Sequence, residues 1–280
     1  MAKTVLVTGA GGYIGRHVVT ALLERGLDVK ALDLRLDGVD ERAERLTLDL
    51  FSGDADIYDQ MGRPDVVLHM AWRDGFKHAS HAHLDDLAKH FHLIENLYAG
   101  GLPQLAVMGT MHEVGYWEGA IDESSPCNPA SLYGIAKNAL RETTFLSAKA
   151  HDAVAQWIRA YYIVGDDKFG NSIFSKLLEA AEEGRTTFPF TTGKNRYDFI
   201  SVDELATQIA AIVDQTEVDG IINACTGEPM SLAERVEAYI RDNDLDITLE
   251  YGAFPDRPYD SPGVWGDPTK IRRILASSAS

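Results

Sequence analysis

A glycine-rich turn near the start of the chain limits the possible folds more than any other feature. The apolar run of residues 4–8 leads into Gly9-Ala10-Gly11-Gly12-Tyr13-Ile14-Gly15, where a helical pattern begins. Glycines between a strand and a helix let a pyrophosphate approach the backbone N–H groups at the helix N-terminus. The turn therefore predicts a dinucleotide site that includes Gly9, Gly12, Tyr13, Ile14 and Gly15.

An acidic residue at the end of the next expected strand supports this interpretation. Asp33 stands 18 residues after Gly15. A carboxylate at that place accepts hydrogen bonds from the adenosine ribose and repels a 2′-phosphate, so we expect NAD as the cofactor. Arg16 and Arg35 lie close enough in sequence to bind a 2′-phosphate, and NADP therefore remains an alternative.

Short apolar runs alternate with helical patterns through the first half of the chain, which predicts an α/β fold with a Rossmann-like, doubly wound parallel sheet. We expect an NAD(P)-binding domain over residues 1–160. The expected strands are 4–8, 29–34, 45–48, 65–69, 104–108 and 153–159, and the expected helices are 13–25, 84–99 and 133–150.

The second half is less regular and is expected to form mostly a smaller C-terminal substrate-binding lobe, residues 161–280, from which some segments return to the sheet. The pattern predicts helices near 172–182 and 232–243, and a strand–helix unit over 198–214. Shorter strands are expected near 221 and 247–251. A proline-rich segment covers 254–268, and the last Ala and Ser residues are expected to fray.

Composition excludes several classes of protein. The chain has 280 residues, of which 45% are hydrophobic, which is typical of a globular fold. Its 26 Lys and Arg against 43 Asp and Glu give a net charge of −17, which disfavours binding to nucleic acid or to anionic membranes. Cys127 and Cys225 form no Cys-x-x-Cys unit, and no apolar run reaches the ~20 residues of a membrane helix. We expect a cytoplasmic protein.

A tyrosine and a lysine one helical turn apart are the candidate catalytic pair. Tyr133 and Lys137 share one face of the helix after the fifth expected strand. The ammonium group, together with an oxidised nicotinamide, is expected to lower the pKa of the phenol. Tyr133 can then exchange a proton with a carbinol oxygen. The alternative is an exposed helix pair without a catalytic role.

These residues together resemble the extended short-chain dehydrogenase/reductase family, the NAD-dependent epimerases, dehydratases and ketoreductases of nucleotide sugars. The segment from Thr8 to Gly15 is similar to the family's TGxxGxxG motif. The segment from Tyr133 to Lys137 is similar to the family's catalytic Tyr-x-x-x-Lys motif. The resemblance covers nearly the whole chain. It implies further cofactor contacts from Asp49, Leu50, Met70, Ala71 and Lys137.

The resemblance also implies substrate-binding residues in the second half. Arg257 stands where the family's arginine holds the sugar-nucleotide pyrophosphate, and Arg196 is a second phosphate candidate. Asn171 resembles the asparagine that meets the diphosphate. A surface loop role for Arg257 and a helix-capping role for Asn171 are the structural alternatives.

The loop after the fifth strand departs from the family pattern. The usual Ser or Thr position holds Met111, so the adjacent Thr110 is expected to polarise the substrate carbonyl, unless it only caps the strand end. The Asp-Glu pair of the dehydratases is His112-Glu113 here, which argues against dehydration but leaves both residues as possible acid/base groups beside the sugar ring. Asp86 and Tyr162 stand where asparagines are common in the family.

Histidines are frequent between residues 78 and 92. Metal binding by them is one interpretation, but no supporting Cys or carboxylate set fixes a geometry, so we expect no metal and a solvated loop and helix surface. The residues are His78, His81, His83, His90 and His92.

The resemblance favours an NAD(P)-dependent reductase of the 4-keto group of a dTDP-like, nucleotide-activated 6-deoxy sugar, with Tyr133 as the proton donor. An NAD-dependent nucleotide-sugar 4-epimerase is the alternative enzyme, and a non-catalytic NAD(P)-sensing protein is the alternative from another class. A homodimer is expected through the helices near 84–99 and 133–150, whose apolar residues could instead only cover the sheet.

Overall fold

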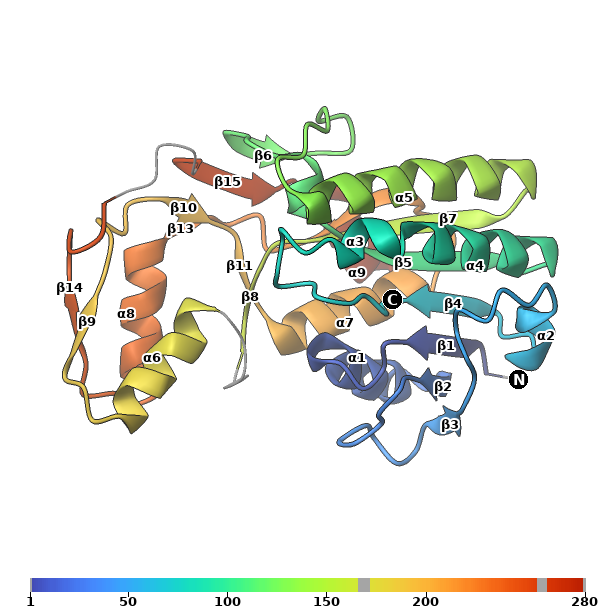
Figure 1. Ribbon diagram of the computed structural model, residues 1–280, viewed down its shortest axis with the longest axis horizontal. Coiled ribbons are helices and arrows are strands. Elements are labelled where there is room, and N and C mark those ends of the chain that lie inside the picture. The colour runs from blue at the N-terminus through green and yellow to red at the C-terminus, as the bar shows by residue number, and fades with distance from the viewer. Residues whose placement is uncertain (1, 166–171, 256–260, 279–280) are drawn as a thin grey trace.

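The computed structural model describes residues 2–165, 172–255 and 261–278. Its centre is a parallel sheet of seven strands in the order β12-β7-β5-β4-β1-β2-β3 (Figure 1). This confirms the expected α/β, Rossmann-like fold. The strands are β1 (Thr4–Thr8), β2 (Asp28–Leu32), β3 (Glu44–Leu46), β4 (Val66–His69), β5 (Gln104–Thr110), β7 (Val154–Ala160) and β12 (Gly220–Ala224).

Helices cover both faces of this sheet because successive strand side chains point to opposite faces. Val5 and Val7 belong to one core, and Leu6 between them belongs to another. The first core is completed by α1 (Tyr13–Glu24), α7 (Val202–Val213) and α9 (Thr269–Ser278). The second is completed by α2 (Ile57–Gln60), α4 (Leu87–Ala99) and α5 (Leu132–Ala150).

The direction in which strands are added reverses beside β1. The chain runs from β1 outward to β2 and β3, and then returns to place β4 on the other side of β1. A crevice opens at the carboxyl ends of the strands at such a reversal, and ligands bind there in open α/β sheets. The ends of β1 and β4 hold Thr8 and His69 side by side.

Much of the second half of the chain, joined by β6 of the first half, builds a smaller lobe beside this sheet (Figure 1). Its core contains Phe174, Leu177 and Phe190. Its helices are α6 (Ile173–Glu182) and α8 (Leu232–Asp242). One four-stranded sheet has the order β13-β10-β15-β6, and two pairs are β11-β8 and β14-β9. The bounds are β6 (Gly119–Ile121), β8 (Tyr162–Val164), β9 (Thr187–Pro189), β10 (Arg196–Tyr197), β11 (Phe199–Ser201), β13 (Met230–Ser231), β14 (Thr248–Glu250) and β15 (Gly263–Gly266).

Two expected helical segments differ in the structure. The helix expected over 84–99 is divided into α3 (Ala82–Asp85) and α4, with Asp86 between them. Of the last Ala and Ser residues, expected to fray, those up to Ser278 belong to α9 (Thr269–Ser278), and residues 279–280 lie outside the described residues. Ile271 and Ile274 of α9 are buried against the first core, and this burial stabilises a helix that its short polar residues alone would not.

Candidate active site

The glycine turn brings the ends of β1 and β4 into contact. Gly9 has a φ of +72°, and a Cβ atom there would lie 2.7 Å from the backbone nitrogen of Ala71. Thr8 Oγ1 accepts hydrogen bonds from the backbone N–H groups of Met70 and Ala71, both at 3.2 Å. A Cβ atom at Gly15 would lie only 2.1 Å from the carbonyl oxygen of Gly9. Only glycine fits at these two places.

Asp33 holds the same turn from the end of β2. Its Oδ2 accepts from the backbone N–H of Gly11 at 2.9 Å, and its Oδ1 accepts from Leu34 at 2.6 Å. The carboxylate therefore lies at the edge of the glycine turn, where the expected ribose contact requires it. Asp49 and Leu50 follow β3 in the chain, and Leu50 lines a separate cavity of about 80 Å³.

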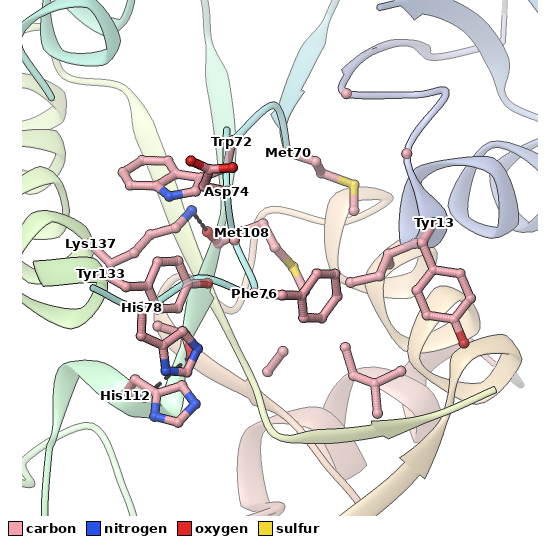
Figure 2. A pocket seen from close by; sticks show the side chains of 18 of the residues that line it. Tyr13, Met70, Trp72, Asp74, Phe76, His78, Met108, His112, Tyr133 and Lys137 are labelled. Atoms are coloured by element: carbon pink, nitrogen blue, oxygen red, sulfur yellow. Dashed lines mark hydrogen bonds between the residues drawn. The ribbon is translucent and has the colours of Figure 1, made fainter. Parts of the chain in front are cut away.

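A cavity of about 560 Å³ lies at the crevice between the glycine turn and α5. Figure 2 shows its side chains, with Tyr13 at one side and Tyr133 and Lys137 at the other. Most of the expected cofactor and catalytic residues line it. Its lining is Gly9, Gly12, Tyr13, Ile14, Gly15, Met70, Trp72, Asp74, Gly75, Phe76, Lys77, His78, Met108, Gly109, Thr110, His112, Tyr133, Lys137, Ala160, Tyr161 and Ile163.

Lys137 is buried in the wall of this cavity. Its Nζ donates a hydrogen bond to the carbonyl oxygen of Met108 at 2.7 Å and lies 3.8 Å from the centre of the Trp72 ring. Burial lowers the pKa of Lys137 to about 7, although the Glu113 carboxylate raises it. The aromatic face and the carbonyl dipole favour the charged form that burial disfavours.

Tyr133 is the second residue of the same helix, whose N-terminus is capped by Ser131 accepting from the backbone N–H of Gly134. Burial raises the pKa of the Tyr133 phenol, and a hydrogen bond with Thr110 offsets part of that shift. The expected lowering by Lys137 is not seen in the chain alone, because burial outweighs other effects on the phenol. A protonated phenol at neutral pH is the state that a proton donor needs.

The ambiguity between Thr110 and Met111 is reduced by the geometry. Thr110 ends β5, lines the cavity and lowers the pKa of Tyr133, whereas Met111 is buried in the first core and does not line the cavity. Thr110 also caps the short helix η1 (Met111–Glu113), since its Oγ1 accepts from the backbone N–H of His112 at 3.3 Å. The capping role expected as an alternative therefore coexists with a place in the cavity.

Glu113 does not lie beside the cavity, as the sequence led us to expect. Its carboxylate is buried, and Oε1 accepts from the backbone N–H of Thr110 at 2.7 Å and from the Trp157 indole at 2.8 Å. Arg159 reaches Oε2 at 3.4 Å. Burial raises the pKa of Glu113 and Arg159 opposes that shift. The Glu113 carboxylate therefore holds the backbone of Thr110 through this hydrogen bond. His112, the other possible acid/base residue, does line the cavity.

The histidine run is not a uniformly solvated surface. His81 and His92 are exposed, but His83 and His90 are buried, which corrects that expectation. His90 bonds His69 at 2.8 Å, and burial lowers the pKa of His90 to about 3. Over residues 2–165, 172–255 and 261–278, no group of three or more His, Cys, Asp or Glu side chains could hold a metal ion.

Of the three residues expected to bind substrate phosphates, the structure describes only Arg196. Asn171 and Arg257 lie outside the described residues. Arg196 is exposed in β10, donates to the carbonyl oxygen of Pro229 at 2.8 Å and does not line the cavity. Asp86 is held by Arg73 at 2.9 Å.

Several cavity residues were given no role in the sequence analysis, and Trp72 and Phe76 are two of them. Trp72 covers Lys137, and its indole N–H donates to His83 at 3.0 Å. Phe76 projects into the cavity from the loop after β4 (Figure 2). Both residues follow the end of a strand at the crevice by a few positions, and this was the available sequence signal for a place in the cavity. Loop residues have no periodicity, however, so the direction of their side chains could not be inferred.

A glycine turn at the sheet reversal, facing a buried tyrosine and lysine across one cavity, defines a site of the short-chain dehydrogenase/reductase class. The chain belongs to the NAD dependent epimerase/dehydratase family, whose model matches residues 5–225. The resemblance stated from the sequence is thereby confirmed.

Individual relatives agree with this assignment. The dTDP-6-deoxy-L-talose 4-dehydrogenase (NAD(+)) of Aggregatibacter actinomycetemcomitans is 41% identical over 269 residues, covering 94% of this chain and 98% of that protein. The probable UDP-arabinose 4-epimerase 1 of Oryza sativa subsp. japonica is 27% identical over 97% of this chain and 74% of its own length. The structure of the UDP-Glc/GlcNAc 4-epimerase of Campylobacter jejuni matches with a TM-score of 0.84 and 20% identity, over 98% of this chain and 93% of that chain.

A search for helices able to cross a membrane found none long and apolar enough within the part of the chain that the structure describes.

Proposed function

We propose that this protein is an NAD-dependent oxidoreductase that interconverts the C4 ketone and the C4 alcohol of a 6-deoxy sugar carried on dTDP. The observation that carries the proposal is the meeting of Tyr133, Thr110 and Lys137 in one cavity whose opposite side is the glycine turn. The 41% identical relative, named for oxidation of dTDP-6-deoxy-L-talose at this carbon, supports the choice of substrate.

The residues of the turn fit a dinucleotide. A Cβ atom at Gly9 or Gly15 would clash with backbone atoms, so the turn stays tight only with glycine, and the N-terminus of α1 follows it directly. Asp33 places a carboxylate where a ribose hydroxyl is expected and a 2′-phosphate would be repelled, which favours NAD over NADP. When bound, NAD supplies or accepts the hydride at C4.

The chain's own residues supply the proton and the position. In the reducing direction Tyr133 donates its phenolic proton to the C4 oxygen, and in the oxidising direction it takes that proton back. Thr110 donates a hydrogen bond to the same oxygen. The buried ammonium of Lys137 stabilises negative charge on the phenol after the proton has left. Glu113 holds the backbone of Thr110 in place.

The test is spectrophotometric. Purified protein is given NADH or NADPH with dTDP-4-keto-6-deoxyglucose, with and without a 3,5-epimerase. Oxidation of NADH only when the epimerase is present is expected, because the talose-named relative implies the L-lyxo ketone. A Tyr133→Phe variant that bound NADH normally and kept the wild-type rate would remove the mechanism.

A 4-epimerase is the second candidate, since several relatives carry that name at about a quarter identity. It would retain its cofactor tightly and show no net oxidation of NADH. Failure of the reductase assay with both ketones, followed by interconversion of UDP-sugars, would establish it. Cofactor binding without turnover on any nucleotide sugar would revive the sensor hypothesis.

The proposal includes a homodimer in the cytoplasm. Helices α4 and α5 lie side by side on one face of the sheet (Figure 1), and α5 exposes Ile135 and Leu146. Two copies packed through these helices would cover that apolar surface. Cys127 and Cys225 are free thiols, which fits a reducing compartment.

A further inference from the structure

Two histidines stand next to the proposed proton donor and come from different parts of the chain. His78 lies in the loop after β4, and His112 lies in η1, two residues after Thr110. Their ring centres are 4.4 Å apart, and His78 stacks on the Tyr133 ring at 5.0 Å with an interplanar angle of 10°. Both line the cavity, and Figure 2 shows them beside Tyr133.

The loop that carries His78 is held to the catalytic helix. The backbone N–H of Tyr133 donates to the carbonyl oxygen of His78 at 3.1 Å. Ser80 donates to Asp74 at 2.8 Å, and His83 bonds the carbonyl oxygen of Lys77 at 3.0 Å, so that the loop is closed on itself. The imidazole of His78 is therefore fixed relative to the proton donor.

These two imidazoles differ from their buried neighbours in hydrogen bonding. Both ring nitrogens of His69 are bonded, to Thr8 and to His90 at 2.8 Å each. Both ring nitrogens of His83 are bonded as well. Within the described residues, no side-chain hydrogen bond is made by either ring nitrogen of His78 or of His112, although both rings are half-buried and face the cavity.

The environment keeps the pair uncharged. Burial and the nearby imidazole of His78 lower the pKa of His112 to about 4, and burial also lowers the pKa of His78. A neutral imidazole offers one donor and one acceptor, which suits an uncharged hydroxyl better than a phosphate or a carboxylate. A methyl group against these nitrogens would leave them without partners.

The position of the pair selects one hydroxyl of the proposed sugar. In the proposed reaction Tyr133 and Thr110 hold the oxygen on C4, and the backbone N–H of His112 donates to Thr110 Oγ1 at 3.3 Å. The carbons next to C4 in a 4-keto-6-deoxy sugar are C3, which carries a hydroxyl, and C5, which carries the methyl group. Only the C3 side offers an uncharged donor and acceptor adjacent to the reacting carbonyl.

We propose that His78 and His112 form a specificity-determining pair that binds the C3 hydroxyl of the substrate and so orients the ring for hydride transfer at C4. This inference rests on the proposed function and deepens it. The two imidazoles recognise a hydroxyl vicinal to a carbonyl, and they exchange no proton with C4 itself.

The test is a double-mutant cycle in which one change removes a histidine side chain of the enzyme and the other removes the C3 hydroxyl of the substrate. Wild type, His78→Phe and His112→Phe are assayed with the 4-keto sugar that wild type reduces and with its 3-deoxy analogue. We expect each variant to lose about tenfold in kcat/KM on the 3-hydroxy substrate and almost nothing on the 3-deoxy analogue, because each lost contact is one neutral hydrogen bond. Wild type itself should lose about a hundredfold on the analogue if both bonds are made.

Controls separate this role from a merely structural one. His81→Asn changes an exposed histidine of the same run and should leave all constants unchanged. His112→Asn and His78→Asn keep a donor and an acceptor and should recover part of the loss. NADH affinity and melting temperature should match wild type in each variant used for the cycle.

Equal losses on both substrates would overturn the inference while leaving the proposed function intact. A wild-type enzyme that discriminates poorly against the 3-deoxy analogue would overturn it in the same way. A wild-type enzyme that reduces no 4-keto-6-deoxy sugar would refute the proposed function, and the inference would fall with it.

Discussion

Lys137 has little water around it, and three neighbours determine how well it holds its charge. The Met108 carbonyl and the Trp72 ring stabilise the ammonium directly, and Glu113 acts over a longer range. Burial is nevertheless the largest effect, so the lysine titrates near neutral pH instead of near 10.5. The bound cofactor would add positive charge next to it, and the balance at this one residue therefore matters for activity.

This lowered pKa predicts a pH-dependent stability. The native protein releases the Lys137 proton near pH 7, whereas the unfolded chain keeps it until near pH 10.5. Between these values the unfolded chain binds more protons, so the contribution of Lys137 to the free energy of unfolding rises with pH. We expect the urea midpoint of the cofactor-free wild type to rise from pH 7 to pH 9 by more than that of Lys137→Met. Parallel curves for the two proteins would contradict a shifted lysine.

Glu113 makes the second residue-scale prediction. Glu113→Gln leaves the buried guanidinium of Arg159 without its ion-pair partner, and it should lower the free energy of unfolding by about 3 kcal/mol in urea titrations. The exposed pair of Asp59 and Arg63 is the matched control, because Asp59→Asn should cost less than about 0.5 kcal/mol. A similarly small loss in the free energy of unfolding for Glu113→Gln and Asp59→Asn would show that the buried ion pair of Glu113 and Arg159 does not stabilise the fold.

At the scale of elements, strand ends and helix starts bring the site together. β5 delivers Thr110, η1 begins there with a reciprocal capping box, and α5 presents Tyr133 one residue after its first residue. The sequence pattern located the strand but ended it at residue 108, two residues before Thr110. Polar residues end apolar periodicity, although backbone pairing with β7 continues through Thr110 and Ala160.

The tight turn between β1 and α1 should not tolerate the single methyl group that an alanine substitution adds. Gly15→Ala places a Cβ atom 2.1 Å from the carbonyl oxygen of Gly9, so the turn must open. We expect a lower melting temperature without cofactor and at least a tenfold weaker NADH affinity by fluorescence titration. Gly75→Ala is the control for stability, because a Cβ atom there meets no atom within 4 Å. Normal NADH binding by Gly15→Ala would show that the turn is not the cofactor site.

At the scale of the whole molecule, segments far apart in sequence complete the same sheet. β12 pairs with β7, α7 packs against α1, and α9 packs against α7 and β12, so the last third of the chain contributes to the first core. The small lobe lies beside the carboxyl ends of the central strands (Figure 1), and Ile163 of β8 lines the cavity. Cofactor and substrate residues therefore depend on both halves of the chain folding together.

The dimer is tested at this scale. Leu146 on α5 is 70% exposed, and a buried contact there would explain an apolar side chain on the surface. Light scattering should give about twice 30.8 kDa for wild type and 30.8 kDa for Leu146→Glu. Leu34→Glu, which changes a fully exposed leucine on the loop after β2, should keep the larger mass. A wild-type mass of 30.8 kDa would refute the dimer.

The sequence by itself determined the fold class, the glycine turn, the place of Asp33 and the pairing of Tyr133 with Lys137. These features depend on local spacing: a strand followed by glycines, a carboxylate at the next strand end, and two residues one helical turn apart. Such patterns can be recognised from the sequence alone because the backbone geometry that they require is local.

Only the tertiary structure decided what surrounds those residues. It placed Glu113 in the core instead of the cavity and buried His83 and His90. It folded residues 269–278 into α9 and set His78, from the loop after β4, against His112 of η1. Each of these outcomes depends on contacts between segments distant in the chain. Burial and pKa follow from the neighbours that packing supplies, and spacing along the sequence carries no information about them.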